Sequence, residues 1–263
     1  MRKVLSAVCV LSTLIFADWS KPKKTELTVL AAASLTDVCT QLKTEYEKEN
    51  PDVKLLFSFG GSGALQAQIE AGAPCDLFIS AAKKQMNALL QKNLMEEDGV
   101  KNLLENKVVL IVPAKGDAGA DAVSAVKISS FEDLTLPQVK MIAIGEPGSV
   151  PVGQYTKAIC ENLRNWEAVS KKANFANDVR TVLNWVEEAA CDCGIVYATD
   201  AAVSQKIRIA AQAPEGSCPP VIYPVGIVKA SSQKAAAGKF EEFLYSDKAK
   251  SIFEKAGFVT LKK

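Results

Sequence analysis

The stretch VKLLFSFGGSGALQAQIEA, residues 53–71, contains a strand, a turn and the start of a helix in one run. Its first seven residues are mostly apolar, three glycines surround Ser62, and a helical pattern begins at Gly63. A glycine-rich turn between a strand and a helix either binds an anion through backbone N–H groups or presents a nucleophile. The stretch therefore predicts an α/β fold and leaves two functions open.

The same order of strand then helix recurs on both sides of this stretch. Short apolar strands that alternate with amphipathic helices predict a mainly parallel sheet covered on both faces. The order fits two α/β lobes better than one continuous sheet, because two strands are placed to connect them. The predicted strands are residues 27–33, 76–80, 107–114, 141–147, 194–200 and 221–229, and the connecting ones are 107–114 and 221–229.

The N-terminal residues have the features of an export signal. Arg2 and Lys3 precede an apolar run over residues 4–16, and the small residue Ala17 follows it. This run is shorter than the roughly 20 residues that a membrane-spanning helix needs. We expect residues 1–25 to be a signal peptide and N-terminal segment, and the mature protein to be periplasmic.

Cys9 lies inside the apolar run, but the bulky Val8 before it disfavours lipoprotein cleavage, so no lipid anchor is expected. The remaining chain is assigned to two lobes. Residues 26–112 together with 221–263 form lobe 1, and residues 113–220 form lobe 2.

The charge of the chain is nearly balanced. Its 263 residues include 31 Lys and Arg against 30 Asp and Glu, a net charge of +1. No strong overall field attracts the protein to nucleic acid or to an anionic membrane. A charged ligand must therefore be bound by local groups.

Six cysteines follow the signal segment, and the chain contains no histidine. An even number of cysteines in an exported protein favours disulfides, with free thiols as the alternative. A zinc site is disfavoured, because such sites use CxxC pairs or histidines and this chain offers one CDC triplet. The cysteines are Cys39, Cys75, Cys160, Cys191, Cys193 and Cys218.

Four strand-to-helix junctions are candidates for a ligand site, because ligands of open α/β sheets bind beyond the carboxyl ends of the strands. They lie at Ser34, Ser62, Val152 and Val179. Each helix start carries about +0.5 charge, so four that converge would supply about +2, enough to balance a doubly charged oxyanion. The alternative is four separate helices with ordinary caps.

Enzymatic chemistry has little support in the sequence. Ser62 resembles a G-x-S-x-G nucleophile, but Ala64 replaces the second glycine and no histidine can act as the base. Ser80 and Lys83 match S-x-x-K without the other motifs that accompany it. A secreted serine hydrolase remains the least supported alternative. The isolated aspartates Asp37, Asp76, Asp178 and Asp200 are interpreted as caps and surface charges.

Five segments resemble the molybdate-binding proteins of bacterial ABC uptake systems, in order and over residues 26–259. They are AAASL (31–35), FSFGGSGALQAQIEAGAPCDLFISA (57–81), GEPGSVPVGQY (145–155), ND-V-R (177–180) and GIVYATDA (194–201). The resemblance implies a two-lobed periplasmic binding protein fold of type II that closes on one tetrahedral oxyanion, molybdate or tungstate. It implies a monomer without enzymatic activity or cofactor, which delivers the ion to a membrane permease.

The resemblance also implies the contacts with the ion. Ser34 and Ser62 would donate through hydroxyl and N–H groups, Val152 and Val179 through backbone N–H groups, and Tyr197 through its phenol. The cysteines depart from the family pattern, and we expect Cys39 and Cys75, which flank the first-lobe site in sequence, to join within that lobe. A binding protein of this fold for another oxyanion, such as sulfate, is the alternative.

Overall fold

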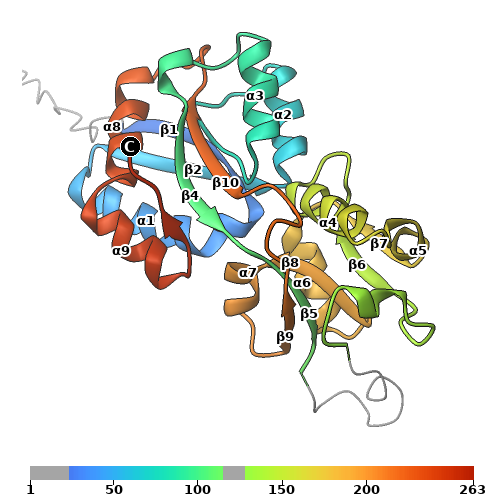
Figure 1. Cartoon of the computed structure of the whole chain (residues 1–263). Coiled ribbons are helices and arrows are strands. Elements are labelled where there is room, and N and C mark those ends of the chain that lie inside the picture. The colour runs from blue at the N-terminus through green and yellow to red at the C-terminus, as the bar shows by residue number, and fades with distance from the viewer. Residues whose placement is uncertain (1–23, 115–127) are drawn as a thin grey trace, which may run out of the picture.

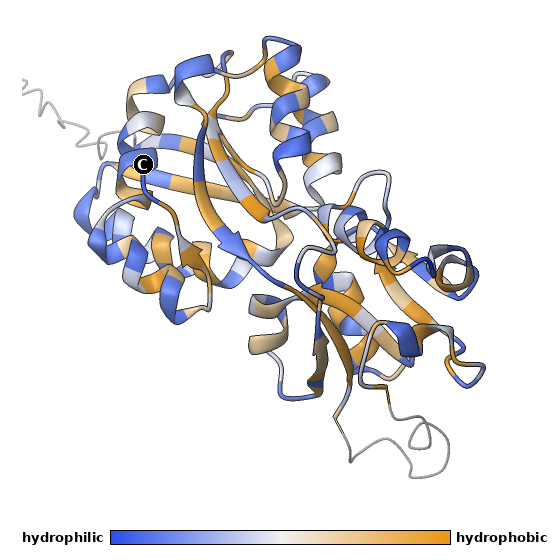
Figure 2. Cartoon of the chain, in the orientation of Figure 1, coloured by the Kyte–Doolittle hydropathy of each residue, from blue (hydrophilic) through white to orange (hydrophobic). Residues whose placement is uncertain are grey.

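The computed structural model describes residues 24–114 and 128–263, and their strands form two separate sheets (Figure 1). The predicted signal peptide, residues 1–25, lies almost entirely outside these ranges. Within them, no helix has the length and apolar character that crossing a bilayer would require. Hydrophobic residues concentrate on the strands, and hydrophilic ones on the outer sides of the helices (Figure 2).

The first sheet has the strand order β11-β4-β10-β3-β1-β2. β1 lies parallel between β2 and β3, whereas β10 is antiparallel to both β3 and β4. The strands are β1 Thr25–Ala32, β2 Val53–Gly60, β3 Leu77–Ile79, β4 Lys101–Asn106, β10 Val221–Ile227 and β11 Val259–Thr260.

Helices cover both faces of this sheet. Alternate residues of β1 point to opposite faces, so Val29 belongs to the core under α1, α8 and α9, and Leu30 to the core under α2 and α3. The elements are η1 Ala33–Leu35, α1 Thr36–Glu49, α2 Ser62–Glu70, α3 Lys83–Gln91, η2 Glu97–Gly99, α8 Lys234–Leu244 and α9 Asp247–Lys255.

The second sheet has the order β7-β6-β8-β5-β9, with β7, β6 and β8 parallel and β5 antiparallel to β8 and β9. Its strands are β5 Val108–Pro113, β6 Ile142–Gly145, β7 Ala173–Ala176, β8 Cys193–Tyr197 and β9 Ile207–Gln212. The elements around it are η3 Glu132–Thr135, α4 Pro151–Asn162, α5 Trp166–Ser170, α6 Val179–Glu187 and α7 Ala198–Ala202.

The chain crosses between the two sheets twice, which confirms the predicted two-lobed fold. It leaves the first sheet after β4 and enters the second at β5, with Lys107 between them. It returns through residues 213–220, between β9 and β10. β5, most of which the predicted boundary between residues 112 and 113 assigns to lobe 1, pairs with β8 and β9 of the second sheet.

Three expectations about secondary structure also need correction. The sheets are mixed rather than mainly parallel, because the strands next to each crossing run antiparallel to their neighbours. The short and partly polar strands β4 and β7 were not predicted. The strand predicted over 141–147 is shorter, because β6 ends at Gly145.

The predicted disulfides are absent from the structure, in which Cys39, Cys75, Cys160, Cys191, Cys193 and Cys218 are all free. Cys39 belongs to the core under α1, and Cys75 to the core under α2 and α3, so the sheet separates the pair suggested for the first lobe. Burial raises the pKa of the Cys75 thiol to about 12, which keeps it protonated and unreactive.

Candidate functional site

All five residues predicted to bind the ligand line one small cavity between the two sheets. Its volume is about 10 Å³, far below the several hundred Å³ of pockets for organic ligands. The lining residues are Ala32, Ala33, Ser34, Gly60, Gly61, Ser62, Ala81, Val150, Pro151, Val152, Val179 and Tyr197.

A larger hollow of about 350 Å³ also lies between the lobes and contains none of the five residues. Its lining is mainly apolar, with Lys83 and Lys84 from α3 and Tyr155 from α4. The small cavity is the better candidate, because several groups with free hydrogen-bonding capacity converge on it.

The first lobe contributes two serines from neighbouring strand ends. β1 and β2 are parallel with Ala32 opposite Gly60, so the turns that follow them lie side by side. Ser34 lies in η1 after β1, and Ser62 is the first residue of α2 after β2. Both side chains are buried, so their hydroxyl groups must find partners in the protein or in the cavity.

The hydrogen bond of Ser62 determines what its hydroxyl offers to the cavity. The N–H of Ala81 donates to Ser62 Oγ at 3.0 Å. Ser62 Oγ therefore acts as an acceptor toward the protein and retains its own hydrogen to donate. Ser34 Oγ lies 3.0 Å from Tyr223 Oη, a contact in which either oxygen could be the donor.

The second lobe contributes the N-termini of two helices. Val152 is the second residue of α4, after Pro151, and Val179 is the first residue of α6. The first N–H groups of a helix have no intrahelical partner, so those of both valines are free to bind an anion. The carboxylate of Asp178 caps α6 through the N–H of Thr181 at 2.9 Å and leaves that of Val179 unused.

Tyr197 ends β8 and is 1% exposed. Its hydroxyl has no hydrogen-bond partner among the described residues, although a buried phenol normally has one. Burial raises the pKa of Tyr197 well above its usual value, so the phenol stays protonated and can donate. Rings of Tyr155 and Tyr223 pack edge-on against it, with centroids 6.4 and 5.8 Å away.

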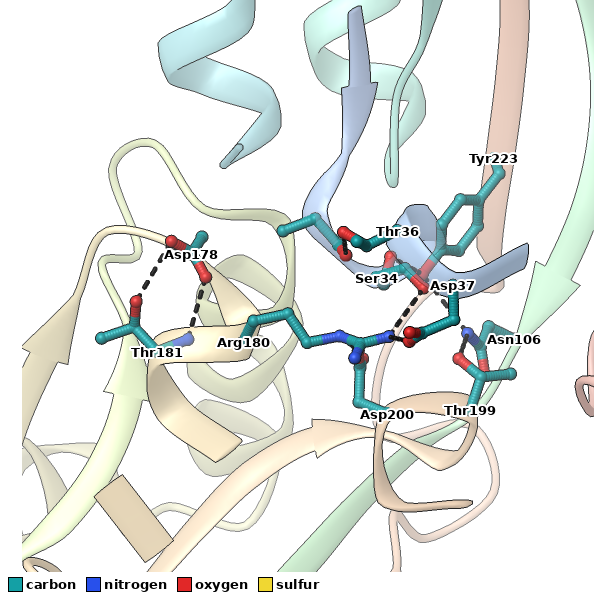
Figure 3. Close-up of polar contacts among 11 residues, drawn as sticks. Ser34, Thr36, Asp37, Asn106, Asp178, Arg180, Thr181, Thr199, Asp200 and Tyr223 are labelled. Carbon is teal, nitrogen blue, oxygen red and sulfur yellow. Dashed lines mark hydrogen bonds and ion pairs between the residues drawn. The ribbon is translucent and has the colours of Figure 1, made fainter. Parts of the chain in front are cut away.

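Among the residues that the structure describes, no Lys or Arg lines this cavity, and the nearest cation along the chain, Arg180, forms ion pairs beside it. Arg180 Nε lies 2.7 Å from Asp200 Oδ1, and Nη2 lies 2.7 Å from Asp37 Oδ2 (Figure 3). Because Arg180 belongs to α6 and Asp37 to α1, the second ion pair connects the lobes. The positive charge of Arg180 is thus balanced by the carboxylates of Asp37 and Asp200.

Asp200 is not the surface charge that the sequence suggested, because its side chain is completely buried beside Arg180. Burial raises the pKa of this carboxyl to about 6, against the opposing effect of the guanidinium. Asp178 is a helix cap, as predicted. The pattern around Asp200 gave no signal of burial, because its partner is a distant residue in the sequence.

The glycines of the turn serve the contact between the lobes. A Cβ atom on Gly63 would lie 2.3 Å from the carbonyl oxygen of Ser149, and one on Gly61 would lie 2.3 Å from that of Asn177. The N–H of Gly63 also donates to Ser149 O at 2.9 Å. Only residues without a side chain allow the second lobe to approach so closely.

The structure gives no support to Ser80 as a nucleophile. Its side chain is fully buried, and its hydroxyl donates to the carbonyl oxygen of Ala82 at 2.8 Å. Over residues 24–114 and 128–263, no group of three or more His, Cys, Asp or Glu side chains is placed to hold a metal ion. The cavity instead gathers neutral donors, which suits an anion.

Sequence reasoning missed the residues behind Ser34. Asn106 Nδ2 donates to Thr199 Oγ1 at 2.8 Å and to Tyr223 Oη at 3.3 Å, and all three side chains are buried. The partners are 93 and 117 residues apart in the chain, so no local motif could reveal them.

Comparison with known proteins gives one family and several relatives. Residues 27–259 match the family model described as bacterial extracellular solute-binding protein. The molybdate-binding protein ModA of Haemophilus influenzae is 40% identical over 89% of this chain and 89% of its own length. ModA of Escherichia coli is 36% identical over 89% of this chain and 88% of its own.

A solved structure shows the same fold. The periplasmic molybdate-binding protein of Azotobacter vinelandii superposes with a TM-score of 0.74 and 23% identity, over 90% of this chain and 100% of its own.

Proposed function

This chain belongs to the family of bacterial extracellular solute-binding proteins, and on that premise we propose that it captures molybdate or tungstate for an ABC transporter. The bound ion would lie in the small cavity between the lobes and pass to a membrane permease. The two ModA relatives support molybdate as the ligand.

One observation carries the proposal, namely that neutral donors from both lobes line a single small cavity. The donors are the hydroxyls of Ser34, Ser62 and Tyr197 and the backbone N–H groups of Val152 and Val179. A hydrogen bond to a charged acceptor contributes about 1.5–3 kcal/mol. Five to seven such bonds, less the costs of ordering and closure, are compatible with dissociation constants between about 1 μM and 1 nM.

Selectivity follows from the same donors. Phosphate carries a proton near neutral pH, and a site made only of donors has no acceptor for it. Sulfate has the charge of molybdate but is smaller, so it cannot reach every donor at once. Tungstate and molybdate are of nearly equal size, and the site would accept both.

The remaining assignments extend the same proposal. Residues 26–106 with 221–263 form one closing lobe and residues 108–114 with 128–212 the other, a division based on sheet membership. Residues 1–25 direct export to the periplasm, where a monomer without cofactor or catalytic activity meets its permease.

Calorimetric titration of the purified protein with molybdate, tungstate, sulfate and phosphate tests this function. We expect the first two ions to bind with micromolar or tighter affinity and phosphate not to bind. Tighter binding of sulfate than of molybdate would identify a sulfate-binding protein of the same fold. Absence of binding by all four ions would overturn the proposal.

A further inference from the structure

Behind Ser34 lies a chain of buried polar groups that ends at the proposed anion site. Ser34 Oγ lies 3.0 Å from Tyr223 Oη, and Asn106 Nδ2 lies 3.3 Å from the same phenol oxygen (Figure 3). Asn106 is the last residue of β4 and Tyr223 lies in β10, so both belong to strands adjoining the crossings between lobes. Thr199 of α7 brings the second lobe into contact with the chain.

The direction of these hydrogen bonds is determined at Asn106. Its Oδ1 accepts the N–H of Lys107 at 2.8 Å, which turns Nδ2 toward the hydroxyls of Thr199 and Tyr223. An amide nitrogen has hydrogens to donate and no lone pair to accept with. Tyr223 Oη is therefore the acceptor in its bond with Asn106.

The hydroxyl hydrogen of Tyr223 has one available acceptor among the described residues. Of the two partners that the described residues offer its phenol oxygen, Asn106 Nδ2 cannot accept, which leaves Ser34 Oγ. Burial raises the pKa of Tyr223 well above its usual value, so the phenol keeps this proton. Ser34 Oγ then accepts from Tyr223 and has its own hydrogen free for the cavity.

We propose that Asn106 and Tyr223 are positioning residues that fix Ser34 as a hydrogen-bond donor toward the bound oxyanion, through the sequence Asn106 Nδ2–H, Tyr223 Oη–H, Ser34 Oγ–H. This inference rests on the proposed function and assigns a role to two residues that do not line the site. Ser62 is also oriented as a donor toward the ligand, because its oxygen accepts the N–H of Ala81. Each serine oxygen thereby accepts from the protein and keeps its own hydrogen for the ligand, so the hydroxyl meets the anion as a donor. Tyr223 is then a determinant of selectivity against phosphate, because it fixes this orientation of the Ser34 hydroxyl.

A strand irregularity places Tyr223. The pairing of β10 with β4 shifts register between Tyr223 and Pro224, where proline supplies no N–H to the ladder. Such bulges redirect side chains locally. The ring is completely buried and packs edge-on against Tyr197 and Phe258, with centroids 5.8 and 5.6 Å away.

The test is a double-mutant cycle on the full mature protein, with Tyr223→Phe and Ser34→Ala measured by calorimetry. Tyr223→Phe keeps the ring and removes the phenol, so we expect the dissociation constant for molybdate to rise about tenfold. Phosphate should gain measurable affinity, because the Ser34 hydroxyl is no longer held as a donor and can turn to accept the proton that phosphate carries. In the Ser34→Ala background, Tyr223→Phe should change the molybdate constant by less than about twofold.

Tyr245→Phe is the matched control, because it removes a phenol that donates to the carbonyl oxygen of Asn102 at the surface. If Tyr223→Phe fails to fold, Asn106→Ala is used in the same cycle, with a smaller loss of about threefold expected. Unfolding temperatures of all variants, measured without ligand, separate stability from binding.

Unchanged affinity and unchanged rejection of phosphate in Tyr223→Phe would overturn the inference. Equal losses in the wild-type and Ser34→Ala backgrounds would also overturn it, because Tyr223 would then act independently of Ser34. These results differ from failure of the proposed function, in which the wild-type protein itself binds neither molybdate nor tungstate and the inference falls with it.

Discussion

The two lobes bring different kinds of donor to the same cavity. The first contributes the side-chain hydroxyls of Ser34 and Ser62, each polarised by a protein partner. The second contributes backbone N–H groups at the starts of α4 and α6, where the side chains are those of valines, together with one phenol. The proposed site should therefore tolerate substitution of the two valines far better than substitution of the two serines.

The largest change in affinity is expected from a substitution at the contact between the lobes. In Gly63→Ala the new Cβ would lie 2.3 Å from the oxygen and 2.8 Å from the Cα of Ser149, so the lobes could not close fully. We expect the affinity for molybdate to fall on the order of 100-fold, since relief requires backbone movement. Calorimetric titration measures this loss.

The stability of Gly63→Ala should change in the opposite direction from its affinity. Alanine is favoured over glycine inside a helix by about 1 kcal/mol, so the unfolding temperature of the ligand-free protein should hold or rise. Gly238→Ala in α8 is the control, because its nearest neighbour would be a flexible atom of Ile227 at 4.0 Å. Wild-type affinity in Gly63→Ala would show that binding does not need this contact.

Removal of the serine hydroxyls should cause the second-largest loss of molybdate affinity. Ser34→Ala and Ser62→Ala should each weaken molybdate binding by about 1–3 kcal/mol, because each removes a hydrogen bond to a charged acceptor. Calorimetry at a single pH and salt concentration gives the comparison.

The matched control in the second lobe is Val152→Ala. It should leave the affinity within about twofold of wild type, while the loss of two buried methyl groups lowers the free energy of unfolding by about 1–2 kcal/mol. A loss of affinity in Val152→Ala as large as in the serine variants would contradict the difference between the lobes.

The same difference explains how far the sequence could predict the site. Glycines and serines at strand ends identified Ser34 and Ser62 as candidates, because these residue types have a recognised role at helix starts. The donor proposed for Val152 is its backbone N–H, and nothing in a valine side chain signals such a donor. The assignment of both valines and Tyr197 came from resemblance to a family, whereas junction chemistry alone left four unrelated helix caps as an alternative.

The fold was predictable to a similar degree. Alternating strands and helices indicated two α/β lobes and their connections, because local periodicity records which residues are buried. The antiparallel direction of β5 and β10 could not be predicted, because it depends on pairing between strands that are distant in the sequence. Asn106, Tyr223 and Arg180 were missed for the same reason, since their partners lie far away in the chain.

Asp200 makes the charged region beside the cavity sensitive to pH. Its pKa in the folded protein is about 6, above the ordinary value of 3.8, so the folded state holds this proton more tightly than the unfolded chain. The stability that the group contributes is therefore present at low pH and lost as pH rises through about 6. From pH 7 to pH 5 it should add about 1 kcal/mol to the free energy of unfolding.

Urea unfolding of wild type and Asp200→Asn at both pH values measures this effect. The variant cannot titrate at this position, so the difference between the two proteins should change by about 1 kcal/mol over that interval. A difference that stays constant would mean that Asp200 remains ionised beside Arg180 throughout.

The smallest expected effect concerns the ion pair that joins the lobes. Asp37→Asn removes the contact with Arg180 and leaves Asp200 as its partner. The Asp37 side chain is 54% exposed, so solvent screens the pair, and we expect at most about a fivefold loss of molybdate affinity, corresponding to about 1 kcal/mol. Because salt weakens exposed ion pairs, titrations in increasing salt should reduce the difference from wild type.

Glu167→Gln is the control for Asp37→Asn, because it removes the same charge from an exposed pair with Lys171 that lies within the second lobe. It should leave the affinity unchanged. A gain of affinity in Asp37→Asn that decreases in high salt would indicate that the freed guanidinium of Arg180 interacts with the anion. The division between a neutral cavity and a charged contact beside it would then fail, since the site would depend on a formal charge as well as on dipoles.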